Sequence, residues 1–285
     1  MKPFTLSTNF KLTTEKNMTA NTLKPTVSIG MPVYNGERYI KEAIDSLLAQ
    51  TFTDFELIIS DNCSTDGTEA ICLEYAKNDE RVRYVKQSQN IGPNKNFEFV
   101  LQESKGEFFM WAAHDDRWSP DCINKLVLAL KENEGAGLAF SNYIIRNLET
   151  GKNHMVIVGV RDGKIKSFNY LMGIFNMCPS MIYGLYKTSL IRGTKFKPFD
   201  FADVNFISEL GLRARIIVLN DFLYIAGTKG ERTPYSLTSG KIKRIPFLKK
   251  QYVLLKQHFS LPVGIVLFLC TCIFMVYNKI RLWRF

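Results

Sequence analysis

The chain of 285 residues lacks the familiar glycine-rich nucleotide motifs of α/β proteins. It has no GxGxxG segment, which disfavours a dinucleotide-dependent dehydrogenase, and no GxxxxGK[ST] segment, which disfavours a P-loop enzyme. It also lacks the GxGTR-type loop of sugar-1-phosphate nucleotidyltransferases. The segment Ser64-Thr65-Asp66-Gly67-Thr68 is similar to the DxDGT motif of aspartate-nucleophile phosphatases, but Ser64 stands where the nucleophile would be. These four enzyme classes are therefore disfavoured.

Cysteine pairs with metal-binding spacing are absent as well. The six cysteines include no CxxC pair and have no secretory context, so we expect reduced structural thiols and no zinc site. Residues 1–26 contain no continuous apolar run. For this reason we expect neither a secretory signal nor a membrane anchor there, but a flexible N-terminal extension.

Acidic residues are missing from the C-terminal part of the chain. Residues 241–285 contain nine Lys or Arg and no Asp or Glu, whereas the remainder balances 28 basic against 27 acidic residues. Residues 259–277 carry no charge, and at 1.5 Å rise per residue they would span roughly 29 Å, close to the ~30 Å hydrocarbon core of a bilayer. The sequence predicts a basic membrane-associating segment, 241–285, with a candidate transmembrane helix at 259–277. A C-terminal core helix is the alternative.

The charges around this apolar run predict which side of a membrane the rest of the chain faces. Six positive residues precede the run and three follow it, which by the positive-inside rule favours a cytosolic body. Cations alternate with aliphatic and aromatic residues before the run, which favours an anionic lipid surface over nucleic acid. We expect a location at the cytoplasmic face of the cell (inner) membrane and no nucleic-acid partner.

What the chain does contain is a series of short apolar runs, each followed by polar residues. Between them, apolar residues recur at helical spacing, as in Ile40, Ala43, Ile44 and Leu47. This alternation predicts an α/β fold with a mainly parallel central sheet, which binds its ligand at the carboxyl ends of its strands. Three strand ends carry polar clusters that define one expected site, namely Tyr34-Asn35, Asp61-Asn62 and His114-Asp115-Asp116.

Four helices are expected before residue 131. They cover Glu37 to Leu48, Asp66 to Lys77, Asn96 to Leu101, and a segment that includes Ile123 and Leu130. Asp66 and Glu69 have capping-box spacing at the start of the second helix. Ser119 is predicted to be the N-cap of the fourth helix, with Pro120 as its first residue.

Four longer segments resemble the family 2 glycosyltransferases, inverting enzymes with the GT-A fold. In chain order they are VSIGMPVYNGERYIKEAIDSLLAQTF, ELIISDNCSTDGT, NIGPNKNFEFVLQESKGEFFMWAAHDDRWSP and FADVNFISELGLRARI. The resemblance extends roughly from Val27 to Ser236. It implies a Rossmann-like nucleotide-diphospho-sugar transferase fold for residues 27–240, with a nucleotide-binding half at 27–131 and an acceptor half at 132–240. The apolar run at 259–277 adds a C-terminal hydrophobic helix to this fold.

The resemblance also implies how a nucleotide would lie against the strand ends. Tyr34 would lie against the base, Asp61 would accept a hydrogen bond from the base edge, and Asp115 would contact the ribose. Lys95 is placed to contact phosphate, with an ordinary surface lysine as the alternative. The implied nucleotide-binding residues are Pro32, Tyr34, Asn35, Glu37, Asp61, Lys95 and Asp115.

Asp116 is implied to coordinate Mg²⁺ or Mn²⁺, which would bridge the diphosphate oxygens. Many family members have an Asp-x-Asp-Asp string here, whereas this chain has Ala113-His114-Asp115-Asp116, so one carboxylate is absent. Whether Asp115 also reaches the metal is left open by this departure. His114 either orients an aspartate or simply packs.

Asp203 matches the position of the family's acceptor-activating carboxylate. As a general base it would contribute about 10²–10⁴-fold in rate. Asp200 is its rival, and a structural role as a helix N-cap is the alternative for either residue.

Together these features predict a non-processive inverting hexosyltransferase of polysaccharide biosynthesis, because the QxxRW motif of processive synthases is absent. The expected partners are a nucleoside diphosphate sugar, a UDP-sugar, as donor, a lipid-linked or cell-surface glycan as acceptor, and a membrane surface. The alternative, suggested by Ala113, is a membrane-associated nucleotide-sugar-binding protein without turnover. Against it stands the retention of four carboxylates that would otherwise repel one another, namely Asp61, Asp115, Asp116 and Asp203.

Overall fold

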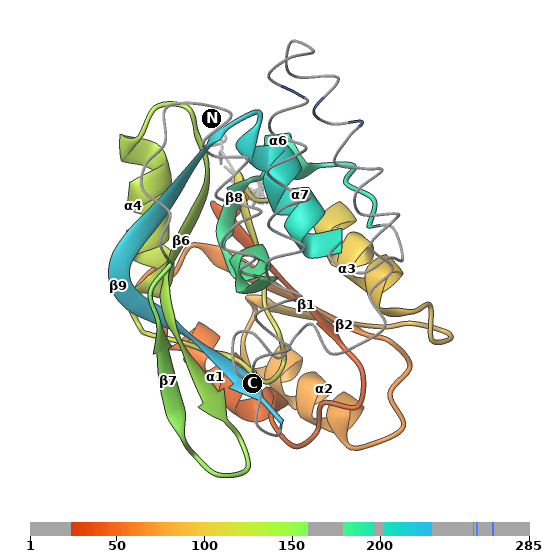
Figure 1. The fold of residues 1–285 in the computed structure, drawn as a ribbon. Coiled ribbons are helices and arrows are strands. Elements are labelled where there is room, and N and C mark those ends of the chain that lie inside the picture. Colours follow the sequence, from red (N-terminus) through yellow and green to blue (C-terminus); the bar gives the residue numbers. More distant parts are fainter. Residues whose placement is uncertain are drawn as a thin grey trace, which may run out of the picture.

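The computed structural model describes residues 24–158, 179–196 and 202–229, together with residues 253, 255 and 264, without the side chains of residues 202–205 and 208. Its strands are β1 (Val27–Val33), β2 (Phe55–Asp61), β3 (Val82–Lys86), β4 (Phe108–Trp111), β5 (Arg117–Trp118), β6 (Ala136–Asn147), β7 (Asn153–Val156), β8 (Leu185–Lys187) and β9 (Arg215–Thr228). Its helices are α1 (Ile40–Leu48), α2 (Thr68–Asn78), α3 (Pro93–Gln102), α4 (Cys122–Glu132), α6 (Thr188–Ile191), α7 (Ala202–Gly211) and the short 3₁₀ helix η1 (Pro179–Tyr183). Figure 1 shows α1 and α2 on one side of the strands and α3 with α7 on the other.

These strands form one mixed sheet in the order β3-β2-β1-β4-β8-β6-β9-β5, with β7 paired to β6. The strands β1 to β4 are parallel to one another, as predicted, because a crossover helix returns the chain between consecutive strands. In the second half of the sheet, β5, β7 and β8 run antiparallel to their neighbours. β6 and β9 run parallel, so the sheet is mixed, and the predicted parallel arrangement is wrong for β5, β7 and β8. β5 follows a loop after β4 and β7 follows a hairpin turn after β6, so no crossover helix precedes either strand.

The apolar stripe predicted for the first helix is confirmed. Ile40, Ala43, Ile44 and Leu47 are all fully buried on the inner face of α1. The helix begins at Ile40 instead of Glu37, because the N–H groups of residues 39 and 40 both donate to the carbonyl of Gly36 at 3.0 Å and form a turn first.

The starts of α2 and α4 differ from the predictions. At α2, Gly67 is the N-cap residue, so the predicted capping box of Asp66 and Glu69 is wrong. The Asp66 side chain still accepts a hydrogen bond from Thr68 N–H at 3.1 Å, and Glu69 pairs with Lys86 of β3. At α4, Asp121 is the N-cap residue, so the prediction for Ser119 and Pro120 is wrong. The carbonyl of Pro120 is taken by the N–H of Thr51 at 2.7 Å, which holds this proline in the preceding turn.

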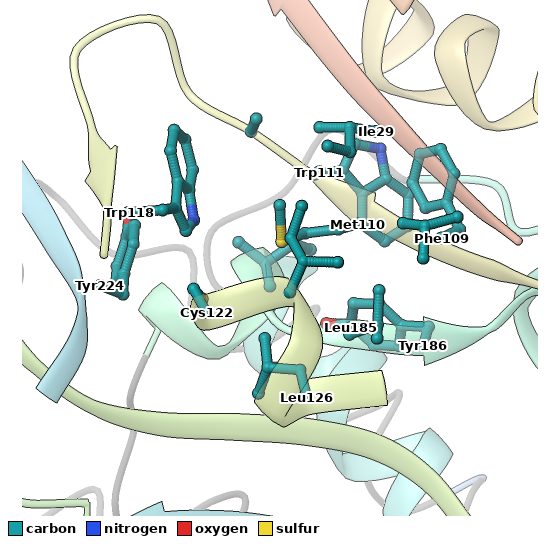
Figure 2. Close-up of a cluster of buried hydrophobic side chains, with 14 of the residues drawn as sticks. Ile29, Phe109, Met110, Trp111, Trp118, Cys122, Leu126, Leu185, Tyr186 and Tyr224 are labelled. Carbon is teal, nitrogen blue, oxygen red and sulfur yellow. The ribbon is translucent and has the colours of Figure 1, made fainter. Parts of the chain in front are cut away.

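Two aromatic groups fix the chain on either side of the loop at residues 112–116. At the end of β4, Trp111 is fully buried, and its indole N–H donates to the carbonyl of Phe97 at 3.0 Å. Its ring packs edge-on against Tyr186, with centroids 5.5 Å apart. After the loop, Trp118 packs beside Tyr224 at 5.9 Å (Figure 2). The acidic residues between these two groups are thus anchored at both ends.

The terminal predictions lie outside the described residues. This is so for nearly all of the 1–26 extension and, apart from Gly264, for the candidate span at 259–277. Among the residues that the structure describes, none belongs to a helix with the length and apolar character needed to cross a bilayer. The described cysteines, Cys63, Cys72 and Cys122, carry free thiols, as expected.

Candidate active site

The loops that follow β1 and β2 are hydrogen-bonded to each other. The backbone N–H of Asn35 donates to the Ser64 hydroxyl at 2.9 Å, and the Asn35 side-chain oxygen accepts from Thr65 N–H at 2.9 Å. The N–H of Gly36 donates to the Thr68 hydroxyl at 2.8 Å. Asn35 adopts a left-handed conformation with φ of 51°, which turns the chain sharply at the strand end. The two loops therefore form one hydrogen-bonded unit.

Glu37 and Asp66 join the same loops a second time. A Glu37 carboxylate oxygen accepts from Gly67 N–H at 2.9 Å, and the Asp66 carboxylate accepts from Glu37 N–H at 3.1 Å. Both acids thus hold loop backbone. The expected contact of Glu37 with a nucleotide stays a prediction.

The side chains at the end of β1 differ in what they offer a ligand. Tyr34 is 47% exposed, so its ring presents a broad face at the strand end that suits stacking. Pro32 is buried within β1, in register with Ser60 of β2, and has little surface for a ligand. The expected contact of Pro32 with a nucleotide stays a prediction.

Asp61 is fully buried at the end of β2. One carboxylate oxygen accepts from Ser64 N–H at 2.9 Å, and the other accepts from the Tyr84 hydroxyl at 2.8 Å. Burial, together with the bond to Asp61, raises the pKa of Tyr84 above its usual range, so this hydroxyl keeps its proton. Both carboxylate oxygens of Asp61 thus have a hydrogen-bond partner in this arrangement. The predicted contact of Asp61 with a base edge stays a prediction.

Asp116, after β4, is only 3% exposed and is held by residues of β9. One carboxylate oxygen accepts from Gly227 N–H at 2.8 Å, and the other accepts from the Tyr224 hydroxyl. A Cβ atom at position 227 would lie 2.1 Å from the carbonyl oxygen of Asp115, so only glycine lets the two backbones approach this closely. The acidic loop and β9 therefore build one site.

The environment of Asp116 opposes its ionisation. Burial, together with the charge of Asp115, raises its pKa to about 8. The unfolded value is about 3.9, so between roughly pH 4 and pH 8 the folded chain holds a proton at Asp116 that the unfolded chain has released. This proton contributes stability that is fully present below about pH 4 and is lost as the pH rises toward about 8.

We therefore expect the metal-free protein to lose stability between about pH 4 and pH 8, and Asp116→Asn, which stays neutral, to lose less. Thermal unfolding in the presence of EDTA across this range measures the difference. Parallel curves for the wild type and the variant would contradict the raised pKa of Asp116.

His114 packs between the two halves of the site. A Cβ atom at Gly36 would lie 2.9 Å from His114 Cδ2, so the imidazole rests directly on that glycine. Burial lowers the pKa of His114, and nearby Lys229 lowers it further against the opposing effect of Asp115. A neutral imidazole packed on Gly36 favours the packing interpretation of His114.

The acidic pair fits a divalent cation only if other oxygens complete the coordination shell. Within the described ranges, no group of three or more His, Cys, Asp or Glu side chains could hold a metal ion. Mg²⁺ is commonly bound by one or two carboxylates together with substrate phosphates. The raised pKa of Asp116 marks a pair of carboxyl groups that a divalent cation would relieve. Asp115 and Asp116 thus fit Mg²⁺ or Mn²⁺ that is shared with a phosphate ligand.

Two cationic side chains lie against the ring of Tyr39, and one of them, Lys229, is near enough to His114 of the acidic loop to lower its pKa. The ammonium group of Lys229, which follows β9, is 5.4 Å from the centre of the Tyr39 ring, and the guanidinium group of Arg38 is 5.1 Å from the same centre. Two cations that share one ring are at most about 10.5 Å apart, which is close to one Debye length at about 0.1 M salt. Their mutual repulsion would be relieved by an anion.

A second pair of cations extends this region. Arg146 of β6 is in register with Gly227, and burial together with the charge of Arg146 lowers the pKa of Arg117. Among the four cations, the only ion pair recorded in the described part of the chain joins Arg117 to Glu42. We call Arg38, Arg117, Arg146 and Lys229 the basic cluster. It carries more positive than negative charge and adjoins the acidic loop.

The remaining predicted residues are placed only in part. Lys95 is exposed in the first turn of α3, where it is open to solvent or a ligand. Asp203 is the second residue of α7, which places it inside the first turn and not at the N-cap. Its side chain, and the whole of Asp200, lie outside what the structure describes, so the role of Asp203 stays a prediction.

Sequence reasoning missed three residues of the site, namely Tyr84, Tyr224 and Gly227. Their contacts with Asp61 and Asp116 cross strand pairings and connect residues 23, 108 and 111 positions apart in the chain. One signal was present for Gly227, because a glycine within a strand pattern often marks a close backbone approach.

Comparison with known proteins places this geometry among sugar transferases. Residues 28–191 match a family model described as Glycosyl transferase family 2. An uncharacterised glycosyltransferase of Rickettsia typhi is 33% identical over 186 residues, which are 65% of this chain and 56% of the relative. The GalNAc(5)-diNAcBac-PP-undecaprenol beta-1,3-glucosyltransferase of Campylobacter jejuni is 29% identical over 174 residues, which are 60% of this chain and 55% of the relative.

Two solved structures have a similar fold. The crystal structure of S. aureus TarS 1-349 in complex with UDP-GlcNAc aligns with a TM-score of 0.63 and 21% identity, covering 81% of this chain and 65% of TarS 1-349. The mannosyltransferase PcManGT from Pyrobaculum calidifontis, in complex with GDP-Man and Mn²⁺, aligns with a TM-score of 0.56 and 17% identity, covering 90% and 72% of the two chains. At these identities the likeness concerns the fold. The chain spans little more than half the length of the two curated relatives named above.

Proposed function

Because this chain belongs to glycosyl transferase family 2 and has the GT-A fold, we propose that it transfers a sugar from a nucleoside diphosphate sugar, a UDP-sugar, to a glycan acceptor. The donor assignment is supported by the exposed Tyr34 ring at the end of β1, beside the carboxyl ends of β2 and β4. TarS, which shares the fold, binds UDP-GlcNAc. We propose inversion of configuration at the transferred sugar, as the resemblance implies.

The observation that carries this proposal is that a pair of acidic side chains, Asp115 and Asp116, adjoins a cluster of positively charged side chains. The acidic loop is held by β9 in an environment that raises the pKa of Asp116. Within the part of the chain that the structure describes, the adjoining basic cluster makes one ion pair, between Arg117 and Glu42. A divalent cation relieves the first excess and a diphosphate relieves the second. A cation–diphosphate complex is therefore the ligand that this combination fits best.

Mg²⁺ or Mn²⁺ is the proposed cofactor. Asp116 and its neighbour Asp115 are the residues that would hold it. When bound, such a cation stabilises the negative charge that develops on the departing diphosphate. Binding of Mn²⁺ by PcManGT, which has a similar fold, supports this choice. On the protein side, β9 fixes the carboxylate of Asp116, and Lys229, which follows β9, supplies positive charge near His114 of the same loop.

For the transfer step we propose Asp203, in the first turn of α7, as the general base. Asp203 takes the proton from the acceptor hydroxyl while the acceptor oxygen bonds to the anomeric carbon of the sugar. The bond from that carbon to the diphosphate oxygen breaks, and its electron pair leaves with the diphosphate. A single displacement of this kind inverts the anomeric configuration.

The proposed acceptor is lipid-linked, and the proposed location is the cytoplasmic face of the inner membrane. The Campylobacter relative is named for an undecaprenol-linked acceptor, which supports a lipid carrier. The basic residues of 241–285 support attraction to anionic lipids.

A binding and hydrolysis screen of the full chain tests the proposed function. UDP-, GDP- and dTDP-sugars would be titrated with and without Mn²⁺, beside Asp116→Ala. We expect metal-dependent binding and slow hydrolysis of one UDP-sugar, and loss of the metal dependence in Asp116→Ala. Binding without turnover toward any glycan acceptor would favour the alternative of a nucleotide-sugar-binding protein. Absence of binding to every nucleotide sugar would overturn both functions.

A further inference from the structure

Tyr224 directs a buried hydroxyl at the acidic loop. The residue is 2% exposed, and its hydroxyl donates to one carboxylate oxygen of Asp116. Figure 2 shows its ring packed beside Trp118. Ring centroids 5.8 to 6.0 Å away surround it, from Trp118, Phe140, Tyr143 and Tyr183. A ring enclosed by four others has little freedom to turn its hydroxyl away from the carboxylate.

The other carboxylate oxygen of Asp116 also accepts a hydrogen bond from β9. The N–H of Gly227 donates to it at 2.8 Å, from a position where the backbones of β9 and Asp115 come so close that a Cβ atom would lie 2.1 Å from the Asp115 carbonyl oxygen. Each carboxylate oxygen has two lone pairs, so each keeps one for a further partner. The direction of these remaining lone pairs is therefore set by β9, a strand remote in sequence.

We propose that Tyr224 is a positioning residue for divalent-cation binding at Asp116. Its hydroxyl fixes the carboxylate so that the remaining lone pairs keep one orientation toward a cation. The inference rests on the proposed function, because it requires a cation at Asp116. Partners in the outer shell of metal ligands typically change metal affinity 10–100-fold when removed.

The test compares Tyr224→Phe with Tyr75→Phe in the full chain. Each variant removes one tyrosine hydroxyl that donates a hydrogen bond to an aspartate. Tyr75 of α2 donates to Asp45 of α1 at an exposed position. Mn²⁺ binding would be followed by the electron paramagnetic resonance signal of the free ion at saturating UDP. We expect Mn²⁺ affinity to fall 10–100-fold in Tyr224→Phe and to stay unchanged in Tyr75→Phe.

Turnover provides a second readout. If Tyr224 acts through cation binding, Tyr224→Phe needs proportionately more Mn²⁺ for its half-maximal rate and recovers most of its kcat when Mn²⁺ saturates. In an Asp116→Asn background, Tyr224→Phe should cost no further Mn²⁺ affinity, because the group that it positions is already gone. A further loss in that background would overturn the inference.

The outcomes separate this inference from the function beneath it. Equal Mn²⁺ affinities of wild type and folded Tyr224→Phe overturn the role of Tyr224 and leave the transferase standing. If the wild type binds a UDP-sugar but no Mn²⁺, the role of Tyr224 and the metal assistance are overturned. If it binds neither, the proposed function is overturned as well. If Tyr224→Phe does not fold, a fluorotyrosine at position 224 keeps the ring and alters the hydroxyl, and an unchanged Mn²⁺ affinity then overturns the inference.

Discussion

Asp203→Asn is expected to lower kcat by about 10²–10⁴-fold while the affinity for the nucleotide sugar changes little. The asparagine side chain keeps the size of the aspartate but cannot accept a proton from the acceptor hydroxyl. Asp203 lies in the first turn of α7, in the second half of the chain, and is not among the residues that we assign to nucleotide binding. Single-turnover transfer to a lipid-linked acceptor measures the rate, and calorimetry with the donor measures the affinity.

Asp200→Asn is the matched control, because Asp200 is the rival base three positions earlier in the chain. We expect this variant to keep kcat close to that of the wild type. The base would be misassigned if Asp200→Asn lost the rate and Asp203→Asn kept it. Product anomers that retain the donor configuration would contradict the single displacement itself.

Gly227→Ala is expected to remove about 10²-fold or more of the transfer rate and to cost about 1–3 kcal/mol of unfolding free energy. The added methyl group would lie 2.1 Å from the carbonyl oxygen of Asp115, a backbone atom that no rotamer change can move. The strand and the acidic loop must therefore separate by about 1 Å to reach ordinary contact. This separation would break the hydrogen bond from residue 227 to Asp116. Transfer kinetics and thermal unfolding would measure the two effects.

Thr228→Ala is the control on the same strand. Thr228 makes a long side-chain contact, 3.4 Å to the Arg146 carbonyl, and its replacement leaves the approach of β9 to Asp115 intact. We expect nearly wild-type rates from it. If Gly227→Ala behaved like Thr228→Ala, the close approach of the two backbones would have no importance for the site.

The first half of the fold could be predicted from the sequence because its signals are local. The buried residues of α1 repeat at helical spacing within nine positions, and each parallel strand is a short apolar run that leads into a loop. The predicted first residues of the helices were wrong where a hydrogen-bonded turn precedes the helix, as at Gly36 and Pro120. Whether a later strand runs parallel or antiparallel depends on the route of its connection through space, which periodicity does not reveal.

The candidate site was predictable in composition and less so in geometry. Polar residues at strand ends identified Tyr34, Asp61 and Asp116, because open α/β sheets bind ligands there. The same reasoning gave no warning that Asp61 would be fully buried, or that Glu37 would bond to the backbone of the neighbouring loop. These outcomes depend on pairings between distant segments, and one sequence read alone contains no measure of such pairings.

The hold of β9 on Asp116 has a consequence for how the protein is made. The two hydrogen bonds that orient this carboxylate close loops of 108 and 111 residues, so they are among the slowest kinds of contact to form. A nascent chain that has emerged only as far as the end of α4 has its crossover helices, but Asp116 still lacks both partners until Arg215–Thr228 leaves the ribosome. Competence to take up a cation therefore arises late in synthesis, after most of the donor side has been able to fold.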